Sequence, residues 1–166
     1  SLFANWVETT QTPAALPEAT SVYTEAIAAH ARLRAGESAL DCFRRMQATG
    51  VRANLVAYTT AIRACASPKL WPVALSLLED MHSDGLRPDT VAYNAALVAC
   101  ERGGQLDEAE CLLRSMQADG PPPDIVSHNT VISTASRLGQ WRRALALLDG
   151  MEEAADEMAP DVYTYA

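Results

Sequence analysis

A repeat of 35 residues is the feature that most restricts what this chain can fold into. Methionine occurs only 5 times in 166 residues, yet four of the five lie 35 residues apart. With methionine at about 3% of the chain, three further matches at one spacing arise by chance on the order of 3 times in 100,000. The same interval separates the members of three columns: Met46, Met81, Met116 and Met151; Ala39, Ala74, Ala109 and Ala144; Tyr23, Tyr58 and Tyr93. We therefore expect a repeat protein in which similar units stack on one another.

The repeat divides most of the chain into four units. We place them at residues 20–54, 55–89, 90–124 and 125–161, and the last unit is two residues longer than the others. Residues 162–166 begin a further unit. Residues 1–19 form an N-terminal flank that fits the end of a preceding repeat.

Each unit contains two helical patterns. In the third unit, apolar residues follow the i, i+3, i+4, i+7 template of an amphipathic helix twice. The two sets are Tyr93, Ala96, Leu97 and Cys100, then Ala109, Leu112, Leu113 and Met116. Gly50, Gly85 and Gly120 follow the second helices, where we expect them to form left-handed C-terminal caps. No stretch alternates as a strand does, so the sequence predicts an all-α solenoid of stacked helix–turn–helix repeats.

A second stripe runs along the opposite face of each first helix. In the third unit, Val91, Asn94, Val98 and Arg102 fall within an arc of ~80° that lies opposite the apolar stripe. The equivalent sets in the other units are Ser21, Thr24, Ala28 and Arg32; Val56, Thr59, Arg63 and Ser67; Val126, Asn129, Ser133 and Arg137. One such helix is an ordinary solvated face. Four in phase indicate a continuous binding surface.

The charge distribution limits the partners of that surface. The chain carries 21 acidic and 13 basic residues, a net charge of −8, which excludes a uniformly basic coat for nucleic acid. The four first-helix segments nevertheless hold four arginines against two glutamates, a net of +2, so the remainder carries −10. A mildly positive strip can still face a polyanion. No apolar run reaches the ~18 residues of a membrane helix, so we expect no membrane partner.

No set of residues indicates catalysis. The sequence lacks a C-x-x-C pair, a nucleotide-binding glycine loop and the H-x-E motif of a zinc deaminase. The three histidines lie far apart, and we expect His128, which stands in the tyrosine column, to be buried. We also expect four reduced and buried cysteines: Cys42, Cys65, Cys100 and Cys111. The sequence thus predicts no enzyme, no metal and no cofactor.

Four segments of the third unit carry a family resemblance. They are Val91-Ala-Tyr-Asn-Ala-Ala-Leu, Gly103-Gly-Gln-Leu-Asp-Glu-Ala, Met116-Gln-Ala-Asp-Gly and Pro123-Asp. Together with the period, these segments resemble the pentatricopeptide repeat, and the resemblance spans residues 20–166. It implies a right-handed solenoid that binds single-stranded RNA, one base per repeat. It also implies a role in organellar RNA processing, stability or translation, in the chloroplast or the mitochondrion.

The resemblance also assigns roles to residues of the second stripe. The fifth and last residues of a unit would read the base as pairs: Thr24 with Asn54, Thr59 with Asp89, Asn94 with Asp124, and Asn129 with Asp161. These pairs imply the sequence A-G-U-U, with the amino terminus toward the RNA 5′ end. The residues resembling the family's base-sandwiching wedge are Ser21, Val56, Val91 and Val126. The residues in the place of its phosphate contacts are Arg32, Arg102 and Arg137, with Arg63 substituting one turn early for Ser67.

Two other functions are open from the sequence alone. Helical solenoids commonly serve as protein-binding scaffolds, and a net charge of −8 suits a basic protein partner. Alternatively, the segment could be a spacer within a larger enzyme.

Overall fold

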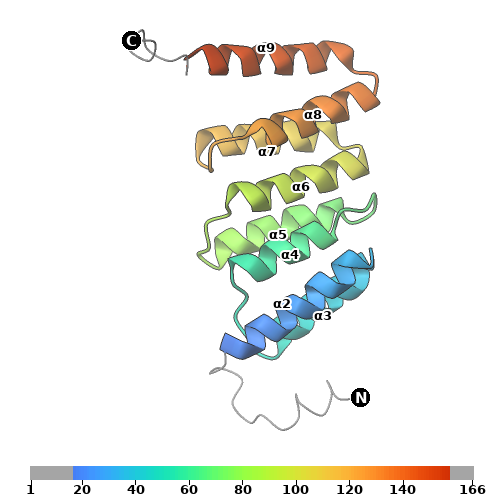
Figure 1. The fold of residues 1–166 in the computed structure, drawn as a ribbon, viewed down its shortest axis with the longest axis vertical. Coiled ribbons are helices and arrows are strands. Elements are labelled where there is room, and N and C mark those ends of the chain that lie inside the picture. Colours follow the sequence, from blue (N-terminus) through green and yellow to red (C-terminus); the bar gives the residue numbers. More distant parts are fainter. Residues whose placement is uncertain (1–16, 158–166) are drawn as a thin grey trace, which may run out of the picture.

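The computed structural model describes residues 17–157, which fold into eight α-helices (Figure 1). They are α2 (Pro17–Arg32), α3 (Gly36–Ala48), α4 (Leu55–Ala64), α5 (Trp71–Ser83), α6 (Thr90–Gly103), α7 (Leu106–Ala118), α8 (Ile125–Arg137) and α9 (Trp141–Glu157). No strand occurs among these residues. The helices stack as successive pairs along one axis, so the predicted all-α solenoid is confirmed. Helix α2 begins at Pro17, inside the flank predicted for residues 1–19.

The repeating methionine and alanine columns form the core of the stack. Met46 and Met81 are fully buried, and Met116 is 1% exposed. The alanine column is buried as well: Ala39, Ala74 and Ala109 are fully buried. Phe43 of α3 packs edge-on against Tyr58 of α4, with ring centroids 5.0 Å apart. One continuous apolar core therefore runs through consecutive units, as expected for a solenoid.

The tyrosine column joins the two helices of a unit. The hydroxyl of Tyr58 in α4 donates to Oδ2 of Asp84, the residue that ends α5, at 2.6 Å. Burial, followed by this hydrogen bond, raises the pKa of Tyr58 well above its ordinary value. In the next unit burial also raises the pKa of Tyr93, with the charge of Asp119 acting in the same direction. His128 replaces tyrosine in the fourth unit and is half-buried, so its predicted burial is only partly correct.

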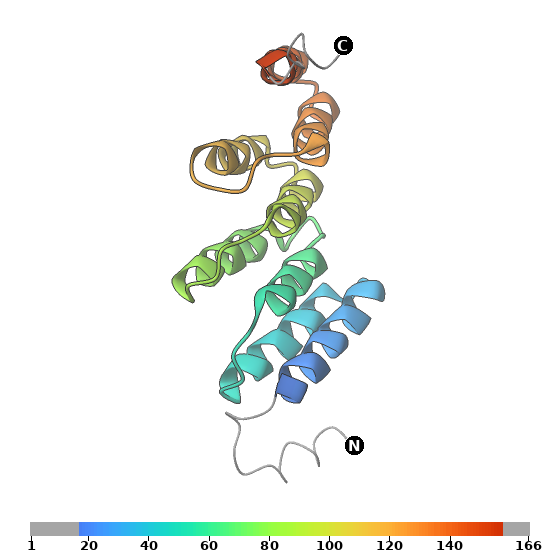
Figure 2. The same ribbon diagram turned by 60° about the vertical axis from the view of Figure 1, so that its left-hand side comes forward.

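Consecutive first helices and consecutive second helices pack differently. Helices α2, α4, α6 and α8 form a row in which each member packs against the next. Within the described residues, no Cα atom of one second helix comes within 8 Å of the next second helix. Figure 2 shows α5 (green) and α7 (gold) projecting from the same side of the first-helix row. Grooves therefore separate the second helices on the outer side of the molecule.

Glycines end several helices in the left-handed conformation. Gly50 and Gly85 have φ of 74° and 76°, as predicted from their positions after α3 and α5. The same prediction for Gly120 is wrong, because its φ is not positive. Gly120 precedes Pro121, and a following proline disfavours helical backbone conformations.

Candidate nucleic-acid interface

The last residue of each of the first three units caps the first helix of the next unit. Asn54, Asp89 and Asp124 are the N-cap residues of α4, α6 and α8. In each, one side-chain oxygen accepts a backbone N–H three residues later, at 2.8 to 2.9 Å. Such a bond satisfies one of the four free N–H groups at a helix start. The cap holds each of these predicted base readers at a fixed place, and it leaves the second polar atom of the side chain available.

One predicted reader pair is joined directly. Asn94 Nδ2 donates to both carboxylate oxygens of Asp124, at 3.1 and 3.2 Å. Ser127 lies beside them, with its hydroxyl 2.6 Å from Asn94 Oδ1 and 2.9 Å from Asp124 Oδ1. The backbone N–H of Ser127, followed by the side chains of Asn94 and Ser127, lowers the pKa of Asp124 against an opposing effect of burial. The pair therefore presents an oriented amide next to a stably ionised carboxylate.

The threonines of the other two pairs are arranged differently. Thr24 and Thr59 donate their hydroxyl hydrogens to backbone carbonyls of their own helices, at 2.7 and 2.8 Å. Each hydroxyl can therefore only accept further hydrogen bonds. No hydrogen bond joins Thr24 to Asn54 or Thr59 to Asp89, all of which the structure describes.

The predicted second stripe is less exposed than expected. Thr59 is only 9% exposed, and Thr24 and Asn94 are half-buried. The prediction treated each first helix alone, whereas α4 lies between α2 and α6 and each neighbour covers part of its flank. Asn129 on α8 is exposed, because no later first helix lies within the described residues. Its predicted partner, Asp161, lies outside the described residues.

Exposed valines recur at the second position of three units. Val56, Val91 and Val126 are 59, 55 and 54% exposed, whereas Val131 on α8 is fully buried. Ser21, at the same position in the first unit, is also exposed. An isolated exposed apolar side chain is ordinary, but three at one position of consecutive units form a regular series of apolar contacts.

The four predicted phosphate-contacting arginines are exposed near the carboxyl ends of the first helices: Arg32, Arg63, Arg102 and Arg137. Arg137 is paired within the protein, since its guanidinium donates to Glu101 Oε1 at 3.1 Å. No ion pair involves the other three within the described residues.

Ser127 is the residue of this site that the sequence reasoning missed. Its hydroxyl contacts both members of the Asn94–Asp124 pair, although it belongs to the following unit. The signal was the spacing of Asp124 and Ser127, which fits an N-cap with a polar residue at the third helical position. The structure has this reciprocal capping box at the start of α8.

Cysteine and histidine form no metal site in the part of the chain that the structure describes. All four cysteines are free, and burial raises the pKa of Cys65 and Cys100 to about 12. The prediction that every cysteine is buried is wrong for Cys111, which is exposed, and for Cys42, which is half-buried. None of the helices over residues 17–157 has the length and apolar character to cross a membrane.

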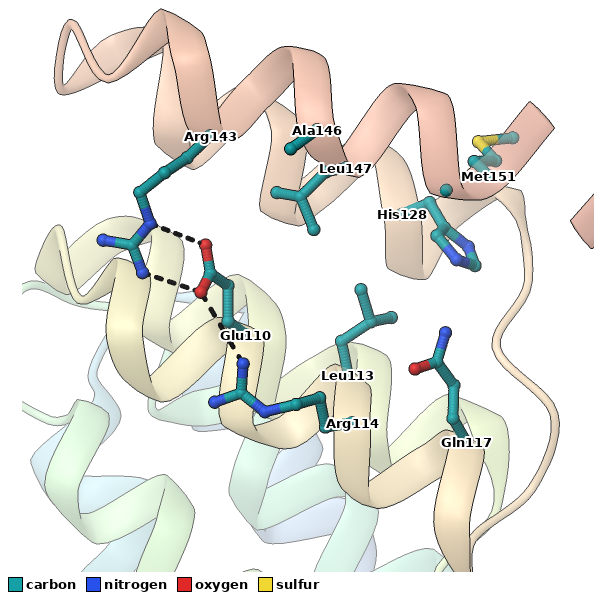
Figure 3. Close-up of a pocket in the computed structure, with 10 residues that line it drawn as sticks. Glu110, Leu113, Arg114, Gln117, His128, Arg143, Ala146, Leu147 and Met151 are labelled. Carbon is teal, nitrogen blue, oxygen red and sulfur yellow. Dashed lines mark hydrogen bonds and ion pairs between the residues drawn. The ribbon is translucent and has the colours of Figure 1, made fainter. Parts of the chain in front are cut away.

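A groove of about 340 Å³ lies between α7 and α9, and no residue that lines it belongs to a predicted reader pair (Figure 3). Arg143, which lines this groove, donates to both carboxylate oxygens of Glu110, at 2.8 and 2.7 Å, and to Asp107 at 2.7 Å. These contacts raise the pKa of Arg143. The guanidinium therefore connects two helices and has little capacity left for a ligand.

Comparisons with known proteins agree with this architecture. Residues 41–102 and 76–137 match the family described as pentatricopeptide repeat domain, and residues 21–51 and 126–154 match the PPR repeat. The crystal structure of PPR10 with an 18-nt psaJ RNA element has 29% sequence identity and a TM-score of 0.73. The comparison covers 81% of this chain and 20% of that one.

Two further solved structures extend this comparison. A triple cysteine-to-serine variant of PPR10 with the same RNA element matches at the same values. PPR10 from maize has 29% identity and a TM-score of 0.73, over 86% of this chain and 20% of that chain. This chain thus spans about a fifth of the length of the PPR10 chains. A comparison with curated protein sequences gives no match. The family matches together extend over most of the described helices, and the chain belongs to the pentatricopeptide repeat family.

Proposed function

We propose that this chain binds single-stranded RNA through the row of first helices, with one base read by each unit. The observation that carries the proposal is the hydrogen-bonded Asn94–Asp124 pair beside the exposed Val91 and Val126. An amide and a carboxylate can match donors and acceptors on a base edge, and the valines can pack on its two faces. The solved complexes of PPR10 with RNA support the same use of this fold.

The preferred RNA sequence is A-G-U-U, from 5′ to 3′. Thr24 with Asn54 reads adenine, Thr59 with Asp89 reads guanine, and the two Asn/Asp pairs, Asn94 with Asp124 and Asn129 with Asp161, read uracil. Arg32, Arg63 and Arg102 contact phosphates, and Arg137 joins them once its pair with Glu101 opens. The protein acts without a catalytic step of its own, in RNA processing, stability or translation in the chloroplast or mitochondrion.

Fluorescence polarisation with short labelled RNAs tests this function. We expect an RNA containing A-G-U-U to bind more tightly than a scrambled RNA of the same composition and than a duplex. Asn94→Thr should shift the preference of the third unit from uracil toward guanine, because it recreates the Thr/Asp combination of the second unit. Equal affinity for the ordered and scrambled RNAs would contradict base reading.

A protein-binding scaffold is the second candidate, and the groove between α5 and α7 favours it. Leu75, Leu78 and Leu112 line this groove together with Glu79 and Glu108, and no lysine or arginine lines it. Such a surface suits a segment that carries both apolar and basic side chains. Absence of RNA binding at low salt, with binding of a basic protein that Glu108→Lys abolishes, would favour the scaffold over the RNA reader.

A further inference from the structure

The hydroxyl of Ser127 has one hydrogen and two short contacts. Its oxygen lies 2.6 Å from Asn94 Oδ1, 2.9 Å from Asp124 Oδ1 and 3.2 Å from the backbone nitrogen of Asp124. The backbone N–H donates to the hydroxyl oxygen, so the hydroxyl hydrogen remains for one acceptor. The shorter contact assigns this hydrogen to Asn94.

Two neighbours therefore hold the Asn94 amide from opposite ends. An ionised carboxylate only accepts hydrogen bonds, so Asp124 requires the Nδ2 end of the amide to face it. The Ser127 hydroxyl donates to the Oδ1 end. A half-turn of the amide about its last torsion would place Oδ1 against the carboxylate and leave the hydroxyl without its short acceptor. The amide is thus fixed in one of two orientations that otherwise have the same shape.

The orientation determines which pyrimidine the amide can read. Uracil carries an acceptor oxygen at C4, where cytosine carries an amino group that donates. Asn94 Nδ2 has a second hydrogen that Asp124 does not require, and this hydrogen suits the uracil oxygen. In the reversed orientation the amide oxygen would suit the amino group of cytosine.

We propose that Ser127 is a positioning residue for base recognition, whose hydroxyl fixes the Asn94 amide so that the third unit prefers uracil to cytosine. The inference rests on the proposed RNA-binding function and adds a third side chain to one of its reader pairs. Among the described residues it applies to this pair alone, since Ala57 and Ala92 stand at the equivalent place beside the first two reader pairs and carry no hydroxyl. The equivalent residue for the fourth pair is Thr164, which lies outside the described residues.

The chain provides a mild variant for the test. Ser127→Ala installs the side chain that α4 and α6 already carry at this position, at Ala57 and Ala92. The N-cap bond of Asp124 is retained, because it uses the backbone N–H of residue 127. Ser127→Thr is the matched control, because it retains a hydroxyl.

Fluorescence polarisation with three RNAs measures the effect: A-G-U-U, A-G-C-U and A-G-U-C. For the unaltered chain we expect uracil to be preferred at the third and fourth positions. Ser127→Ala should reduce the preference for uracil over cytosine at the third position about fivefold and leave the preference at the fourth position unchanged. Ser127→Thr should retain the third-position preference of the unaltered chain. Side-chain NMR of Asn94 without RNA should show faster hydrogen exchange of the amide in Ser127→Ala.

The outcomes distinguish failure of the positioning role from failure of the proposed RNA-binding function. If the unaltered chain discriminates between bases and Ser127→Ala keeps its third-position preference, the positioning role is overturned and RNA reading stands. An equal loss at both positions, with a lowered melting temperature, would reduce Ser127 to a structural residue. No binding of any RNA by the unaltered chain would overturn the proposed function and this inference together.

Discussion

At the residue scale, Asn54, Asp89 and Asp124 cap helices and, in the proposed function, would also read bases, and the two tasks require different things of a side chain. Capping a helix requires only an oxygen that accepts a backbone N–H, and both asparagine and aspartate supply one. Reading a base depends on the second polar atom, which is an amide nitrogen in asparagine and a carboxylate oxygen in aspartate. Exchanging asparagine and aspartate at these positions should therefore preserve the helix cap but change which base is read.

Substitutions of Asp89 separate these tasks. Asp89→Ala should lower the free energy of unfolding by about 1 kcal/mol, because Ala92 N–H loses its acceptor at the start of α6. Asp89→Asn should change the stability by only a few tenths of a kcal/mol while shifting the second unit from guanine toward adenine. Urea denaturation and RNA polarisation measure the two effects. Equal destabilisation by both substitutions would refute the separation.

The ionisation of Asp124 gives a prediction that needs no RNA. Its hydrogen bonds favour the charged form, so its pKa lies below the ordinary value of 3.8. The stability that this carboxylate contributes is present above 3.8 and is lost as the pH falls through the lowered pKa. An NMR titration of the Asp124 carboxyl carbon should give a midpoint below 3.8 that rises in Asn94→Ala. A midpoint at or above 3.8 would contradict the hydrogen-bond network.

The sequence predicted the positions of these readers better than their surroundings. The period of 35 places Thr59 and Asn94 at the same position of their units, and both lie on first helices as expected. Their exposure differs because it depends on neighbouring helices, which a helical wheel of one element does not contain. The contact of Ser127 with Asn94 joins residues 33 apart in sequence and required the packed structure.

At the element scale, residues that lack a side chain set how closely the helices approach. Gly36 begins α3, and a Cβ atom there would lie 2.6 Å from the backbone oxygen of Ala64 at the end of α4. Gly103 near the end of α6 has a similar place, because a Cβ atom would collide with the indole ring of Trp71 on α5. The helices of neighbouring units thus touch where one of them carries only a hydrogen.

Substitution of Gly36 tests this close approach. Gly36→Ala should lower the free energy of unfolding by about 2 kcal/mol, because the backbone of Ala64 has to move. Gly150→Ala is the matched control, since no atom lies within 4 Å of a Cβ at that position of α9. Removing a glycine from an exposed helix should raise the stability by about 0.5–1 kcal/mol. Thermal denaturation of both variants measures the difference, and a stable Gly36→Ala protein would contradict the role of the contact.

Helix periodicity was sufficient to predict the type of element but not every helix end. The apolar template of the third unit lies on α6 and α7 as predicted. Gly120 was predicted as a left-handed cap by analogy with Gly50 and Gly85, yet only Gly120 precedes a proline. The proline that follows Gly120 has no counterpart after Gly50 or Gly85, so the repeat pattern did not predict the different conformation of this turn.

At the scale of the whole molecule, the proposed function requires a chain of net charge −8 to attract a polyanion. The exposed arginines lie on the row of first helices, which also carries the predicted base readers, whereas acids such as Asp107 and Glu108 lie on second helices. Separation of the charges onto two rows gives a local attraction that the net charge does not reveal.

The salt dependence of RNA binding measures this attraction. Arg102→Ala should weaken binding to every RNA alike and reduce the slope of log K against log salt by about 0.7, the value for one contact with a single strand. Arg44→Ala is the control, because it removes the same charge from the outer groove between α3 and α5. An equal change of slope for both variants would mean that total charge, rather than its placement, drives binding.

Among the described helices, the lack of backbone contact between consecutive second helices has a mechanical consequence. Each of α3, α5 and α7 packs on the first helices of its own unit and of the next unit but not on the next second helix, so a small tilt between units changes the width of the outer grooves while the first helices stay in contact. Such elasticity would let the spacing of the units follow the spacing of successive bases along a bent strand. The polar bridge from Arg143 to Glu110 and Asp107 limits this bending at one joint, between α7 and α9.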